Sequence, residues 1–250
     1  WISGLYPWMR SYNLALWATI TSTREEAQGH QEWGTKRRTA RKRPSYLIFV
    51  KRFHPALVWI RSLFQGVVNQ EARLGRWFPL ECRLHEPKSV IRCDASPGGM
   101  GGILLHKSVV QEFWADEVTD QDLAFFKAER ESTWQPEFEL LSILISLRLW
   151  GEKLRWQSIT VHGDALAALF AAQRTSSKSP AVHFIAGEIG LCCGRLSITI
   201  TCKHVPESIN VEADVLSRLH EGKPIPARLA AATRIVAPTR DASFYLQERA

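Results

Sequence analysis

The chain has 250 residues, of which 45% are hydrophobic and 23% charged, and its formal net charge is +7. This composition is normal for a globular protein with a packed core. No stretch approaches the roughly 18 to 20 apolar residues of a membrane span, and no signal peptide pattern is present, so we expect an intracellular protein, cytoplasmic or nuclear, without a membrane partner. The five cysteines are odd in number and lack CxxC spacing, which argues against a disulfide framework and a zinc site.

The charge is unevenly distributed along the chain. Residues 1–85 carry a net charge of +9, residues 86–222 carry −5, and residues 223–250 carry +3. A basic flank attracts a phosphate backbone, whereas clustered carboxylates attract metal ions. Three parts are therefore expected: a basic N-terminal extension (1–85), a central domain (86–222) and a linker-like tail (223–250) that is rich in proline.

In the N-terminal extension, the apolar spacing predicts helices only at residues 8–20 and 55–70. Between these two segments, residues 36–43 contain six cations in eight positions. Such a block repels itself and is typical of a solvated loop, but a nucleic-acid contact or a nuclear-targeting patch is an equal alternative. The cations are Lys36, Arg37, Arg38, Arg41, Lys42 and Arg43.

The central domain changes to short apolar runs separated by turns. Three such runs at 89–93, 101–105 and 109–114 indicate an antiparallel meander. A buried helix is expected at 137–150, where Pro136 is suited to a helix start. The remaining elements are expected as a strand at 158–161, helices at 165–173 and 181–192, a strand at 196–202 and a helix at 211–219. This order predicts an α/β fold with a mixed five-stranded sheet, three antiparallel strands followed by parallel ones, flanked by helices.

Four carboxylates fall at informative places in this order. Asp94 ends the first strand, Asp164 follows the fourth, Glu139 lies on the long helix, and Asp214 lies on the last helix. Taken singly, an aspartate at a strand end is usually a turn or capping residue. Because the first and fourth strands are predicted to be parallel neighbours, however, Asp94, Asp164 and Glu139 should meet. Carboxylates that meet in this way raise each other's pKa unless cations neutralise them, and Mg²⁺ prefers oxygen ligands.

The same stretch resembles the ribonuclease H domain of retroelement reverse transcriptases, particularly those of long-terminal-repeat and tyrosine-recombinase retrotransposons. The matching sequences are CDAS at 93–96, with Gly98, Gly101 and Gly102 after it; FELL at 138–141; GDA at 163–165; and HVPESINVEADVLSR at 204–218. The last match is the most specific, since a histidine, a proline, an asparagine and an Ala-Asp-x-Leu-Ser-Arg run occur in register. The resemblance covers a little over half of the chain.

The resemblance implies an endonuclease that hydrolyses the RNA strand of RNA–DNA hybrids within a retroelement polyprotein. It implies that two Mg²⁺ ions (Mn²⁺ is an alternative) bind Asp94, Glu139, Asp164 and Asp214, and that His204 assists proton transfer or product release. Ser96 is expected to contact the substrate, and Asn210 either contacts the substrate or orients the loop that carries His204, with a structural turn role as a further alternative. The implied partners are the hybrid and a reverse transcriptase domain, and the extension would then be a remnant of a polymerase thumb or connection.

Two departures from the sequence pattern of this family leave other interpretations of the function open. Ala165 stands where the family commonly has asparagine or serine, and Glu137 could replace Glu139, although the Leu140–Leu141 pair favours Glu139. A catalytically inactive, nucleic-acid-binding remnant is the first alternative, because fold does not guarantee function. Another nuclease or a strand-transfer enzyme of the same fold is the second. Such enzymes use three acids, so Asp214 and the His204 loop favour the ribonuclease.

Overall fold

The computed structural model describes residues 87–128, 135–177 and 179–245, together with the isolated residues 16, 54, 57 and 61. The helices expected at 8–20 and 55–70 lie outside the described residues, apart from the isolated positions named above. The cationic cluster at 36–43 lies wholly outside them. In the described part of the chain, no helix is both long and apolar enough to cross a membrane.

The meander of three strands is confirmed. β1 (Ser89–Ala95), β2 (Gly99–His106) and β3 (Val109–Glu117) pair antiparallel, and β1 also pairs with β4 (Ser158–Gly163) in parallel. β5 (Thr199–His204) continues the sheet beside β4, so the strand order is β5-β4-β1-β2-β3-β6. The sixth strand, β6 (Thr233–Arg234), was not expected, and it adds two residues parallel to β3. The mixed α/β class is thus confirmed, with six strands in place of five.

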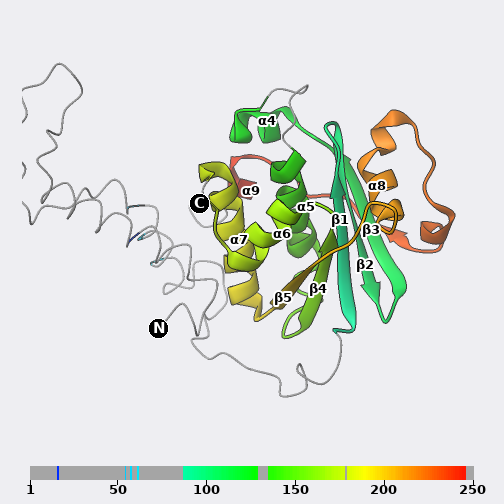
Figure 1. Cartoon of the computed structure of the whole chain (residues 1–250), viewed down its shortest axis with the longest axis horizontal. Helices are drawn as coiled ribbons and strands as arrows, with labels where there is room; N and C mark the ends of the chain where they lie inside the picture. Colours follow the sequence, from blue (N-terminus) through cyan, green and yellow to red (C-terminus); the bar gives the residue numbers. More distant parts are fainter. Residues whose placement is uncertain are drawn as a thin grey trace, which may run out of the picture.

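Helices cover both faces of the sheet (Figure 1). α5 (Gln135–Trp150) packs on β1 and β2, and α6 (Leu166–Arg174) and α7 (Pro180–Leu196) pack beside it. α8 (Val211–Ser217) packs on β1, β2 and β3 from the other side. α5 carries apolar side chains around its whole circumference because it lies between the sheet and two helices, as its sequence predicted. Its fully buried residues include Leu140, Leu141, Leu144, Ile145 and Leu147.

Close packing of α8 depends on the glycines of β2. A Cβ atom added to Gly101 would lie 2.4 Å from Leu216 Cβ and 3.0 Å from the Leu216 backbone. Any side chain at Gly101 would therefore push α8 away from the sheet. Since Gly101 pairs with Asp94 across the β1–β2 hairpin, this contact fixes the distance between α8 and Asp94.

A short helix, α4 (Asp120–Phe126), was missed by the sequence analysis. It begins with a capping box in which the Thr119 hydroxyl accepts a hydrogen bond from the Asp122 backbone N–H, and the Asp122 carboxylate accepts one from the Thr119 backbone N–H. The Thr-x-x-Asp spacing that carries this box is readable in the sequence.

The segment from 223 to 250, expected to be a linker, is corrected by the structure over much of its length. Short 3₁₀ helices η3 (Leu219–Glu221) and η4 (Ala227–Leu229), β6 and α9 (Ala242–Tyr245) follow α8. Arg240 is buried and binds Asp122, and Phe244 and Tyr245 belong to the main hydrophobic core. Burial of a paired cation and two aromatic rings makes residues 227–245 part of the fold rather than a connector.

Candidate metal centre

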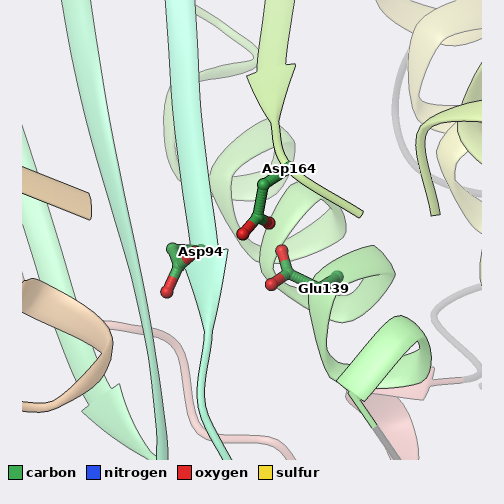
Figure 2. Close-up of side chains that lie close together, drawn as sticks. All are labelled: Asp94, Glu139 and Asp164. Atoms are coloured by element: carbon green, nitrogen blue, oxygen red, sulfur yellow. The ribbon is translucent and has the colours of Figure 1, made fainter. Parts of the chain in front are cut away.

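Three elements bring carboxylates to one end of the sheet. Asp94 is the next-to-last residue of β1, and Asp164 directly follows β4, the parallel neighbour of β1. Glu139 lies in the second turn of α5, which packs against β1. Because parallel strands end at the same edge of a sheet, Asp94 and Asp164 emerge at one edge, and α5 brings Glu139 close to Asp164 there (Figure 2).

The three carboxylates form a tight cluster. One oxygen atom from each of Asp94, Glu139 and Asp164 lies within 4.8 Å of the others. Asp94 and Glu139 are only 4% and 3% exposed, while Asp164 is half-buried. Glu139 Oε1 also accepts a hydrogen bond of 3.0 Å from the Ala95 backbone N–H, which fixes its side chain against the end of β1. Glu137 is not part of this cluster.

Burial and mutual repulsion raise the pKa values of two members of the cluster. Burial, together with the charges of Asp164 and Asp214, raises the pKa of Asp94 to about 7 against the opposing effect of a hydrogen bond from Ser217. Burial and the charges of Asp94 and Asp164 raise the pKa of Glu139 well above its usual value. A close set of carboxylates with raised pKa values fits divalent cations with oxygen preference, which would restore the ionised forms.

Asp214 lies beside this cluster but outside it. Its carboxylate Oδ1 accepts a 2.7 Å hydrogen bond from Arg218 Nε, one turn further along α8. Its charge contributes to the raised pKa of Asp94, so the two carboxylates are electrostatic neighbours. Ligation of a metal by Asp214 stays a prediction, and it requires the carboxylate to leave Arg218 or to share it.

Ser217 is a site residue that the sequence analysis did not single out. Its hydroxyl donates a 2.7 Å hydrogen bond to Asp94 Oδ2 and lies 2.8 Å from the Asp214 carbonyl oxygen. Ser217 is fully buried, so this bond is shielded from water. Two sequence signals could have found this role: the position of Ser217 three residues after Asp214, on the same face of α8, and its place in the Ala-Asp-x-Leu-Ser-Arg run. Ser217 orients Asp94 and ties β1 to α8.

The two residues predicted to contact substrate are buried. Ser96 is 1% exposed, and its hydroxyl donates to the carbonyl oxygen of Ser217 at 2.7 Å. Asn210 is fully buried, and its Nδ2 donates to the carbonyl oxygen of Cys93 at 3.0 Å. Because neither side chain has accessible surface in this structure, substrate contact by Ser96 or Asn210 stays a prediction that needs a local rearrangement. They hold the β1–β2 turn and the start of α8 next to Asp94.

The histidines have different surroundings. His204 ends β5, is exposed, and pairs in the sheet with Gly163, the residue before Asp164. This position beside the cluster is compatible with the predicted proton-transfer role, which stays a prediction. His162 is half-buried, and burial and the nearby charges of Arg92 and Lys203 lower its pKa to about 4.

Comparisons with known proteins add little to this geometry. No protein-family model matches the chain, and no curated protein sequence matches it. Among solved structures, the chain is similar to an RNase H1 from the halophilic archaeon Halobacterium salinarum, with a TM-score of 0.42 and 14% sequence identity. The match covers 54% of this chain and 97% of that chain. The fold class given above rests on the strand order and helix placement.

Proposed function

We propose that this chain is a metal-dependent endonuclease that hydrolyses the RNA strand of RNA–DNA hybrids. The observation that carries the proposal is the cluster of Asp94, Glu139 and Asp164, with one oxygen of each within 4.8 Å of the others. Two further observations support it: the raised pKa of Asp94, which favours a cation at this place, and the position of Asp214 beside the cluster.

Each residue has a defined task in this proposal. Asp94, Glu139 and Asp164 supply the oxygen ligands for two Mg²⁺ ions, or Mn²⁺ in their place, and Asp214 adds a fourth carboxylate. Ser217 holds Asp94 in place, and the Ala95 backbone N–H holds Glu139. When bound there, divalent ions would supply Lewis-acid chemistry for the hydrolysis, by activating a water and neutralising charge on the leaving 3′ oxygen. His204, with an exposed imidazole beside Asp164, accepts or delivers a proton at the edge of the site.

The retroelement context belongs to the same proposal. In it, residues 86–222, together with the packed segment at 227–245, form the nuclease unit of a reverse transcriptase polyprotein, and the basic extension at 1–85 is a remnant of the polymerase that would precede it. Preference for RNA would come from contacts to 2′-hydroxyl groups rather than from base identity. The expected partners are the hybrid and a reverse transcriptase domain.

One observation favours the alternative of an inactive, nucleic-acid-binding remnant. Ala165 stands at the N-cap of α6 and makes no side-chain cap hydrogen bond. Asparagine, aspartate or serine would cap this helix better, and a polar residue next to Asp164 would add a group to the site. This alternative is supported if the folded protein binds an RNA–DNA hybrid but does not cleave it.

A pair of variants on α5 tests the proposal with a built-in control. We expect Glu139→Gln to lower the rate of Mg²⁺-dependent cleavage by about 100-fold or more, since it removes one charged ligand of the cluster. Glu137→Gln, two residues away and outside the cluster, should change the rate less than about threefold. The assay follows a hybrid labelled on the RNA strand or on the DNA strand. Equal loss in both variants, or cleavage of both strands, would contradict the proposal.

A further inference from the structure

Three nitrogen-bearing side chains form a row across three neighbouring strands. Arg92 on β1 is paired with His162 on β4, and His162 is paired with Lys203 on β5. Side chains of paired residues in a parallel sheet project from the same face. The row therefore crosses the sheet next to the carboxylate cluster.

Among the described residues, no helix covers the face of β4 and β5 on which this row lies. Along β4, residues 159, 161 and 163 are buried, while 158, 160 and 162 are half-buried; along β5, residues 199, 201 and 203 are exposed. The helix that contacts both β4 and β5, α6, packs on the same side as α5 and α7, and α8 covers β1, β2 and β3. Lys203 is exposed and forms no ion pair with any residue in the described ranges.

The charge of the row is only partly neutralised. Glu212 on α8 faces two guanidinium groups, because it pairs with Arg92 at 3.4 Å and with Arg228 at 2.9 Å. Two nitrogen atoms, Arg92 Nε and His162 Nδ1, are buried and have no hydrogen-bond partner among the described residues. Such atoms are rare in folded proteins. The row therefore has an excess of positive charge, whereas these two nitrogen atoms are shielded from solvent and would contact a ligand only after a side-chain movement.

The row is aligned with the candidate metal centre. Asp94 follows Arg92 by two residues, and Asp164 follows His162 by two residues. Along β1, the two residues from Arg92 to Asp94 span about 7 Å and return to the same face. Asp164 lies one residue beyond the end of β4 at Gly163. The distance from Arg92 to Asp94 is similar to the spacing of neighbouring phosphates in a nucleic-acid strand. A strand with one phosphate at the carboxylates can therefore place the next phosphate over the row.

We propose that Arg92, His162 and Lys203 form a phosphodiester-binding row that holds the nucleic-acid backbone next to the carboxylate cluster. This inference rests on the proposed function for the class of ligand, although binding can be measured without cleavage. Arg92 and Lys203 supply the charge, and His162 between them supplies hydrogen bonds. Residues 86–222 have a net negative charge. The row places positive charge locally beside the carboxylate cluster, where a phosphate backbone would otherwise be repelled.

The test measures binding of a fluorescent RNA–DNA hybrid to the full chain in EDTA, where cleavage is prevented, over a series of salt concentrations. Removal of one phosphate contact reduces the slope of log affinity against log salt by about 1. We expect this reduction for Lys203→Gln, with several-fold weaker binding, and a reduction of about 2 for the double variant with Arg92→Gln. Arg228 still pairs with Glu212 in that variant. Lys107→Gln, in the exposed turn at the opposite end of β1 from Asp94, is the matched control.

The outcomes separate this inference from the proposed function. Slopes that fall for the row variants but not for Lys107→Gln support the row, even if Mg²⁺ produces no cleavage and the nuclease proposal fails. The phosphodiester-binding row is refuted if the slope of log affinity against log salt is the same for Lys203→Gln, the double variant and the control. This holds even where the protein cleaves RNA. Absence of hybrid binding by the unmodified protein also refutes the row.

Discussion

Replacing Asp94 with asparagine is expected to stabilise the metal-free protein by about 1–3 kcal/mol near pH 8. Asp94 is 4% exposed, and burial and neighbouring carboxylates raise its pKa to about 7. Ionising this group at alkaline pH therefore costs free energy in the fold but not in the unfolded chain. Asparagine keeps an oxygen that can accept the hydrogen bond from Ser217 and has no charge to bury.

The sign of the pH dependence follows from the same shift. Between the unfolded pKa of about 3.9 and the folded value of about 7, the native protein binds more protons than the unfolded chain. The stability of the metal-free protein should therefore fall as pH rises through this window, and remain lowered above it. Asp94→Asn should flatten this dependence, and the two proteins should converge near pH 4.

Urea unfolding in EDTA across this pH range measures the effect. Mg²⁺ should stabilise the unmodified protein more strongly at about pH 8 than at about pH 5, because the carboxylates must be ionised to bind it. The stabilisation by Mg²⁺ should be much smaller in Asp94→Asn. Glu207→Gln, at an exposed carboxylate of the loop after β5, is the control and should change stability by less than about 0.5 kcal/mol. A lower stability of Asp94→Asn in EDTA at alkaline pH would contradict this reasoning.

The second large effect concerns the C-terminal segment, where Arg240→Met is expected to destabilise the fold by about 3–5 kcal/mol. Arg240 Nε lies 2.9 Å from Asp122 Oδ1, and Arg240 Nη1 lies 2.6 Å from Asp116 Oδ2. The side chains of Arg240 and Asp122 are 1% and 0% exposed. Loss of the guanidinium would leave the Asp122 carboxylate buried without its cation, although Tyr245 still donates to it.

A surface ion pair supplies the comparison for this variant. Arg228→Met removes one of the two arginine partners of Glu212, and the Arg228 side chain is 54% exposed. This substitution should cost less than about 1 kcal/mol. Chemical denaturation of the two variants gives both values directly. A cost below about 1 kcal/mol for Arg240→Met would mean that residues 227–245 contribute little to the fold. Truncation after residue 222 should be at least as damaging, since it also removes Phe244 and Tyr245 from the core.

The sequence predicted the parts of this protein that depend on local pattern. The long apolar run of α5 and the strand-ending positions of Asp94 and Asp164 are visible in the chain order. Because topology alone brings these strand ends together, the three-carboxylate cluster follows from the order of elements. The extra helix α4 was missed because its Thr119–Asp122 box is brief and the apolar pattern behind it is short.

Contacts between distant segments could not be predicted in the same way. Ser217 and Asp94 are separated by 123 positions, and Arg240 and Asp122 by 118. Nothing in the local pattern around Arg240 distinguishes it from a solvated arginine in a proline-containing tail. The burial of Ser96 and Asn210 was likewise hidden, because a polar residue near a site is read as a substrate contact until its hydrogen-bond partners are known.

The most direct test of the central claim is cleavage of an RNA–DNA hybrid by the full chain in Mg²⁺, compared with Asp94→Asn. Because the variant is expected to be at least as stable as the unmodified protein when both are metal-free at about pH 8, unfolding of the variant is not the expected cause of a loss of activity, and a denaturation curve in the assay buffer checks this. Cleavage confined to the RNA strand and abolished by the substitution is the predicted result. A folded protein that leaves the hybrid intact with Mg²⁺ and with Mn²⁺, or an Asp94→Asn variant that cleaves at the same rate, would contradict a catalytic metal centre at these carboxylates.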